Sequence, residues 1–162
     1  MLNPSAIRRI TMDDVELHHL FQQPQLRHDV ARLIHEEFWT HVPGASVEGM
    51  AERLTRADRA DRVPLCRVAV HQGQAIGVVN LIESDDDDRT HWTPWLAGMV
   101  VAAPWRGRGV GSRLVRTLLD DARGLGVTRV YFGTDGPGFY TRLGAVLHEQ
   151  LRADFCFMRF DL

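Results

Sequence analysis

The stretch APWRGRGVGSRL, residues 103–114, decides the fold because it joins a strand pattern to a helix pattern through closely spaced glycines. The preceding residues 95–102 form a β-rich run, and apolar residues recur at helical spacing after Gly109. Gly107, Gly109 and Gly111 can adopt positive φ angles and admit oxygen atoms that a Cβ would block. A strand that ends in such a turn and opens a helix presents unpaired N–H groups at the positive end of the helix dipole. The stretch therefore predicts an anion site, with phosphate as the obvious anion.

Two common phosphate-binding motifs do not fit this glycine spacing. The dinucleotide fingerprint GxGxxG, begun at Gly107 or Gly109, would need its third glycine at Ser112 or Leu114. The P-loop needs a lysine followed by Ser or Thr, and this neighbourhood has no lysine. The spacing disfavours both nucleotide sites, while a purely structural tight turn stays open as an alternative.

The composition is typical of a soluble globular protein. The 162 residues are 44% hydrophobic and 25% charged, so we expect a single domain over residues 1–162 with a core of its own. The formal net charge of -2 disfavours a general nucleic-acid binder, which normally carries a basic surplus. We therefore expect a small or locally recognised partner.

The first ten residues, MLNPSAIRRI, contain neither the apolar core of a signal peptide nor a run that could span a bilayer. We therefore expect a cytoplasmic protein with no membrane partner. The two cysteines, Cys66 and Cys156, lie in apolar runs without a second Cys or His at metal-ligand spacing. The sequence predicts buried, reduced thiols and no metal site.

The hydrophobic periodicity predicts a mixed α/β order of elements. We expect an opening strand near residues 7–10, a helix after Thr11, a helical stripe over 26–39 and another helix over 46–60. The later elements are two strands around the QGQ turn within 65–84, a strand over 95–102, a helix from 109 to a terminating Gly124, a strand over 129–135, a short helix over 136–144 and closing strands within 145–150 and 154–160.

The glycine loop resembles the R/Q-x-x-G-x-G/A signature of the GNAT superfamily of N-acetyltransferases, with Arg106, Gly109 and Gly111 in the signature positions. In that family the loop amides hold the pyrophosphate of acetyl-CoA, and the preceding strand runs beside the pantetheine arm. The resemblance implies a mixed, mostly antiparallel central sheet flanked by helices and acetyl-CoA as co-substrate. The residues it assigns to cofactor binding are Met99, Val100, Val101, Arg106, Gly107, Arg108, Gly109, Val110, Gly111, Ser112, Asp135 and Phe139.

A second block, GFYTRLGA, resembles the family's F-Y-x-x-x-G-F motif, with Phe139, Tyr140 and Gly144 in register. The family's aromatic residue after the glycine is replaced by Ala145. Two blocks in the right order are more specific than either alone. The resemblance covers the chain from about Cys66 onward, and the first sixty residues, which usually shape the substrate site, match only in being helical.

Acetyl transfer to an amine needs a proton acceptor, because an unperturbed amine with a pKa of about 10.4 is protonated at neutral pH. Glu83, which closes the strand run beside the one before the loop, is our candidate base, with a solvated strand-end charge as an equal alternative. Tyr140, by its motif position, is the residue implied to protonate the departing thiolate. Backbone N–H groups around residues 99–101 would stabilise the oxyanion if the strand is splayed from its neighbour as in the family.

The acceptor is less constrained by the sequence. Asp85–Asp88 form an acidic run that is either a solvated hairpin tip or a feature that steers a cationic amine. Trp92 and Trp95 flank it, and either could pack over an ammonium group, although burial is expected for at least one. The resemblance implies an enzyme acting on a small-molecule or peptide amine, and homodimers are common in the resembled family. A non-catalytic acetyl-CoA-binding sensor and a nucleotide-binding protein stay open as alternatives.

Overall fold

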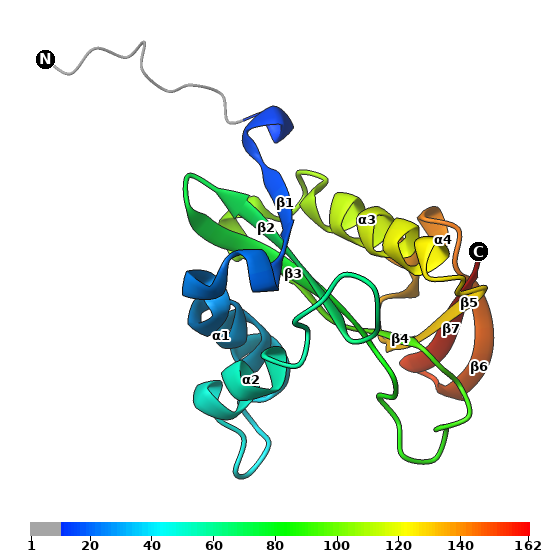
Figure 1. Cartoon of the computed structure of the whole chain (residues 1–162). Coiled ribbons are helices and arrows are strands. Elements are labelled where there is room, and N and C mark those ends of the chain that lie inside the picture. The colour runs from blue at the N-terminus through cyan, green and yellow to red at the C-terminus, as the bar shows by residue number, and fades with distance from the viewer. Residues whose placement is uncertain (1–10) are drawn as a thin grey trace, which may run out of the picture.

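A computed structural model describes residues 11–162 (Figure 1), so the strand predicted near residues 7–10 lies outside the described residues. The prediction of a helix after Thr11 is wrong. Residues 12–14 form one 3-10 turn, and β1 (Glu16–His19) follows and pairs antiparallel with β2 (Leu65–His71). Of the two acids in this turn, Asp13 and Asp14, it is Asp14 that accepts from the Thr11 N–H at 3.4 Å and caps a single turn. The next residues bond to the free edge of β2, which outweighs their weak helical pattern.

Two helices follow, as the apolar periodicity over 26–39 and 46–60 predicts. α1 (Arg27–Phe38) buries Val30, Ala31 and Ile34, and α2 (Val47–Leu54) begins after Ser46, whose side chain accepts from the Gly49 N–H at 3.0 Å. The predicted helix over 46–60 is too long by six residues. It ends at Leu54 because the Thr55 hydroxyl bonds the Glu52 carbonyl and the chain turns to bury Ala57.

The sheet has seven strands in the order β1-β2-β3-β4-β5-β7-β6. All neighbouring strands are antiparallel except β4 and β5, which confirms the expected mixed, mostly antiparallel sheet. The remaining strands are β3 (Gln74–Ile82), β4 (Trp95–Val101), β5 (Arg129–Thr134), β6 (Val146–Arg152) and β7 (Phe155–Asp161).

Helices cover both faces of the sheet, as Figure 1 shows. α1 and α2 pack on one face over side chains such as Val68, Val78 and Val100, while α3 (Val110–Gly124) and α4 (Pro137–Arg142) cover the other. α3 ends at Gly124, as expected, but the residue with left-handed backbone is Gly126, at φ +79°. Because each strand alternates its side chains between these two cores, the register of β4 is fixed from both sides.

A partly buried ion pair fixes α3 against the sheet. The Arg67 Nε atom donates to Asp121 Oδ2 at 2.7 Å and its Nη2 atom donates to Oδ1 at 2.8 Å, with both side chains mostly shielded from solvent. This geometry is the bidentate pairing that makes arginine–carboxylate contacts strong. It holds the helix whose N-terminus faces the glycine loop.

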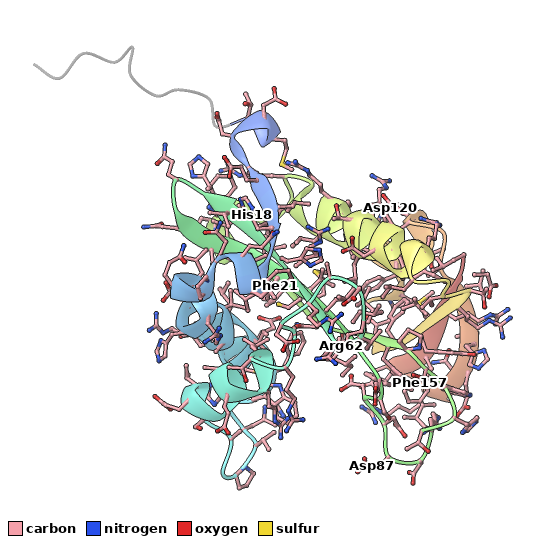
Figure 2. All side chains as sticks on the ribbon, in the orientation of Figure 1. His18, Phe21, Arg62, Asp87, Asp120 and Phe157 are labelled. Atoms are coloured by element: carbon pink, nitrogen blue, oxygen red, sulfur yellow. The ribbon has the colours of Figure 1, made fainter. Side chains whose placement is uncertain are left out.

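We expect Asp121→Ala to lower the free energy of unfolding by about 3 kcal/mol, because it leaves the Arg67 guanidinium partly buried without its anion. Asp120→Ala is the matched control: Asp120 lies on the outer side of α3 (Figure 2) and pairs with Arg123 in solvent. Its loss should cost less than about 0.5 kcal/mol. Urea unfolding measures both, and equal losses would contradict the structural role of the buried pair.

Candidate active site

The parallel strands β4 and β5 meet at one end and separate along the rest of their length. A single register pair, Trp95 with Tyr131, joins them, and the Tyr131 N–H donates to the Pro94 carbonyl at 3.0 Å. From there to Val101 and Thr134, at the carboxyl ends of the strands, no further pair follows among the described residues. The sheet therefore contains a wedge-shaped gap that opens toward the glycine loop.

Backbone N–H groups of β4 face this gap. The Ala102 N–H donates to the Ile76 carbonyl of β3 at 2.8 Å, so alternation along the strand turns the N–H of Val101 the other way. The Val101 carbonyl accepts from Arg106 Nε at 2.8 Å, which agrees with that orientation. The same alternation directs the N–H of Met99 into the gap. Within residues 11–162, these two donors have no paired strand across the gap.

The glycine loop ends in an uncapped helix N-terminus. Gly109 has φ +87° and precedes α3, and the first helical hydrogen bond runs from the Arg113 N–H to the Gly109 carbonyl at 3.1 Å. Within residues 11–162 the N–H groups of Val110, Gly111 and Ser112 therefore have no hydrogen-bond partner, and the first turn has no acidic residue. These donors and the helix dipole favour an anion.

The loop glycines leave room for that anion. Gly107 has φ +72° and Gly109 φ +87°, and a Cβ added at either meets no protein atom within 4 Å. At Gly111 an added Cβ would lie 3.3 Å from the Phe139 ring. The surface above the loop is thus open where a pyrophosphate would rest, so these residues fit the phosphate part of coenzyme A.

A cleft of about 650 Å³ extends from the loop along the last residues of β4, and no residue of β5 lines it within the described part of the chain. Of the residues assigned to cofactor binding from the sequence, it is lined by Met99, Val100, Val101, Arg106, Gly107, Gly109, Val110, Gly111, Ser112 and Phe139. The residues it adds are Glu37, Trp105, Arg116, Arg142 and Leu143. Four predicted site residues, Arg108, Asp135, Tyr140 and Glu83, do not line this cleft among the described residues.

The two loop arginines have different surroundings. Arg106 bonds the Val101 carbonyl and lies 3.3 Å from the Glu37 carboxylate at the end of α1, so it links the first helix to the cleft. Arg108 instead packs over the Trp105 ring, with 5.5 Å between its guanidinium carbon and the ring centroid. Glu37 has no local sequence signal, whereas Arg116 follows Ser112 by four residues and therefore shares its helix face.

Tyr140 lies beside the cleft, packed against the sheet. Its ring centroid is 4.4 Å from that of Phe132 and 4.9 Å from that of Phe139. Burial, helped by the nearby negative charge of Asp135, raises the pKa of Tyr140 to about 12. The hydroxyl is therefore a protonated donor over the whole physiological pH range. Asp135 itself is exposed at the end of β5.

Glu83 follows the last residue of β3, Ile82, which pairs with Trp95 at the closed end of the wedge. Its side chain is exposed. It therefore lies at the opposite end of β4 from the glycine loop.

The acidic loop contains an arginine, Arg89, that pairs with one of its carboxylates. Asp87 projects at the loop tip (Figure 2), whereas Asp86 lies 3.3 Å from the Arg89 guanidinium. That guanidinium packs 5.4 Å above the Trp92 ring and also bonds Glu149. The position over Trp92 considered for a substrate ammonium group is occupied by Arg89, and Trp95 is buried.

Residues 29–145 match the model of the acetyltransferase (GNAT) family. The chain belongs to this family. The match covers both motifs and the residues that line the cleft, so the family assignment rests on the same residues that form the candidate site. Within the described residues, no helix has the length and apolar character that a membrane crossing needs, and no three potential ligands from Asp, Glu, His and Cys gather into a metal site.

Solved structures share the GNAT fold of this chain. An aminoglycoside 6'-N-acetyltransferase complexed with coenzyme A is 18% identical, with 90% of this chain and 96% of that one covered at a TM-score of 0.70. The PaiA N-acetyltransferase from Thermoplasma acidophilum, in complex with coenzyme A, is 13% identical, with 91% and 99% covered at 0.68. An acetyltransferase from Trypanosoma brucei is 26% identical, with 87% and 99% covered at 0.62. No curated protein matches the sequence.

Proposed function

We propose that this protein is an N-acetyltransferase that transfers the acetyl group of acetyl-CoA directly to a primary amine of a small molecule or peptide. The observation that carries the proposal is the cleft that joins the last residues of β4, where that strand has separated from β5, to the open N-terminus of α3. The coenzyme A complexes of two structural neighbours support the choice of co-substrate.

Acetyl-CoA supplies an activated thioester: the amine nitrogen bonds to its carbonyl carbon, the carbon–sulfur bond breaks, and the proton lost by nitrogen replaces the acetyl group on sulfur. The free N–H groups of Val110, Gly111 and Ser112 would hold the pyrophosphate. The N–H groups of Met99 and Val101 would donate to the carbonyl oxygen as negative charge develops there.

Tyr140 is the proposed donor to the departing sulfur. Its pKa of about 12 lies above the value of about 8.5 typical of a thiol, so complete proton transfer from the phenol runs uphill. We therefore assign to Tyr140 a hydrogen bond that stabilises the thiolate until the amine proton arrives.

Transfer is direct because neither cysteine is suited to attack. Cys66 is buried, and burial raises the pKa of its thiol to about 12, so it stays protonated. Cys156 is also buried, and burial raises the pKa of its thiol as well. An acetyl-cysteine intermediate would need a thiolate at the cleft.

Glu83 is the proposed base, acting through water because it lies beyond the closed end of the wedge. We expect kcat/KM for the amine to fall toward acidic pH in the wild type and Glu83→Gln to remove that limb. On the alkaline side Tyr140 stays protonated, so its ionisation should not lower the rate until the pH nears about 12. A pH–rate profile measures both limbs. An acidic limb kept by Glu83→Gln would exclude Glu83, and a tyrosine-dependent fall near pH about 10 would contradict the shielding of Tyr140.

The family and the aminoglycoside acetyltransferases among the structural neighbours support the proposed acceptor class. The competing function is a sensor that binds acetyl-CoA without turnover. Calorimetry with coenzyme A, NAD and ATP, paired with a thiol-release assay on acetyl-CoA and an amine panel, separates the two. Binding of coenzyme A with amine-dependent thiol release supports the enzyme, whereas binding without release from any amine supports the sensor.

A further inference from the structure

One polar side chain is buried on the α1 side of the sheet without a partner. Asn80, in β3, is 8% exposed, and its amide makes no hydrogen bond within residues 11–162. The side chains around it, such as Ile34, Val78 and Cys66 on the facing strand, are apolar. Its amide atoms keep some contact with solvent, because the fully shielded polar side-chain atoms without a partner in residues 11–162 are His19 Nδ1 and Arg89 Nε. A mostly buried amide without a protein partner, in apolar surroundings, contributes little to stability, so an apolar residue of the same size would serve the fold at least as well. The position therefore calls for a role other than stability.

The amide lies at an irregularity of β4. The register between β3 and β4 shifts between Val78 and Asn80, and Gly98 in this bulge has φ +57°. A Cβ at Gly98 would lie 3.0 Å from Asn80 Nδ2. The glycine therefore serves both the bent backbone and the space that the amide occupies. Bulges of this kind often re-aim groups next to active sites.

The bulge is also where the cleft ends. Val101, Val100 and Met99 line the cleft in turn from the glycine loop inward, and the next residue of β4 is Gly98. Asn80 thus lies next to the inner end of the cleft, on the face of the sheet that α1 covers. An acyl group that reaches Met99 along β4 from the loop would arrive beside this amide.

We propose that Asn80 binds the acceptor amine, with its Oδ1 atom accepting an N–H of the nitrogen that attacks the thioester. The inference rests on the proposed function and names a residue for its amine site. A carboxamide neither takes nor gives up a proton here, so Asn80 orients the nitrogen and leaves deprotonation to a base. The ligand chemistry is a primary amine, whose two or three N–H bonds can satisfy Oδ1 while the lone pair, once free, faces the carbonyl carbon.

The first test measures stability, because removing the Asn80 amide should weaken amine binding without lowering the Tm. Asn80→Leu, which removes the unpaired amide and keeps the volume, should leave the Tm unchanged or raise it by a few degrees. Val68→Ala is the control within the same apolar cluster and should lower the Tm, because it opens a cavity. If Asn80→Leu lowers the Tm as much as Val68→Ala does, the amide supports the bulge and the inference is overturned.

The second test reads the amide directly with spermidine, kanamycin and the dipeptide Gly-Lys as probes. In ¹⁵N-labelled protein saturated with coenzyme A, at least one probe should shift the Asn80 side-chain NH₂ signals, which are identified by their absence from Asn80→Asp. If none of the three probes shifts these signals, the inference fails.

Kinetics with any probe that is acetylated should show a KM for the amine raised about tenfold by Asn80→Leu, with the KM for acetyl-CoA within about twofold of wild type. Val68→Ala should leave both KM values unchanged. A shifted amide signal, with neither acetylated product nor released thiol from any amine of the panel, would overturn the proposed function and keep Asn80 as an amine-binding residue. Product formation with an unchanged amine KM in Asn80→Leu would overturn the role of Asn80 and keep the proposed function.

Discussion

Replacing Gly109 with valine is expected to weaken coenzyme A binding by about 100-fold or more. At φ +87° a β-branched residue is strained, so the turn before α3 would have to change. The added side chain would also occupy the open space above the loop, where the structure has no protein atom within 4 Å of the Cβ position. Both effects act on the N–H groups that would hold the pyrophosphate. Isothermal titration calorimetry with coenzyme A measures the loss.

Gly44→Val is the matched control for this substitution. Gly44 has φ +79° and equally open surroundings, but it lies in the connection between α1 and α2 and does not line the cleft. The control should lower the Tm to a similar extent and leave the affinity for coenzyme A within about twofold of wild type. Intact coenzyme A binding by Gly109→Val would refute the assignment of the loop.

Tyr140→Phe is expected to lower kcat by about 100-fold while the affinity for coenzyme A changes by less than about twofold. The hydroxyl would act on the sulfur as charge develops, so its loss affects the transition state more than the bound state. We place the effect at the lower end for an acid catalyst because a donor with a pKa of about 12 is weakly acidic. Steady-state kinetics with saturating acetyl-CoA measures kcat.

The other tyrosine of the chain, Tyr131, provides the control. It lies at the closed end of the wedge, stacked on Trp92 with 5.5 Å between the ring centroids. Tyr131→Phe removes a hydroxyl of the same kind away from the proposed sulfur position and should leave kcat within about twofold. Equal turnover by Tyr140→Phe and wild type would remove Tyr140 from the proposed role.

The central unit was predictable because its signals are local. The glycine spacing, the β-rich run before it and the apolar period after it all lie within a short segment, and each has one structural solution. The same holds for β2 and β3 around their turn. The segment after Thr11 lacked such a signal. Its acids favour a helix start, but pairing with β2 decides its conformation, and the paired residues lie 48 to 54 positions apart in the sequence.

The candidate site likewise contains residues that the sequence predicts and residues that only the fold reveals. The backbone donors from Met99 to Ser112 follow from the loop motif, whereas Glu37 reaches the cleft through the packing of α1, which no spacing reveals. Trp92 illustrates a different difficulty. Its position near acidic residues suggested that a substrate cation could pack over its ring. In the structure the cation over that ring is Arg89 of the same chain. Asn80 reads in the sequence as one polar residue in an apolar strand, and its position beside the bulge becomes visible in the fold alone.

The most direct test of acetyl transfer at this wedge is mass spectrometry of an amine panel incubated with the protein and acetyl-CoA. The panel would hold polyamines, aminoglycosides, amino acids and short peptides, with Gly109→Val as the inactive control and free thiol measured in parallel. We expect an acetylated amine and one coenzyme A thiol released per acetyl group transferred. Coenzyme A binding by the wild type with neither acetylated product nor released thiol would contradict it.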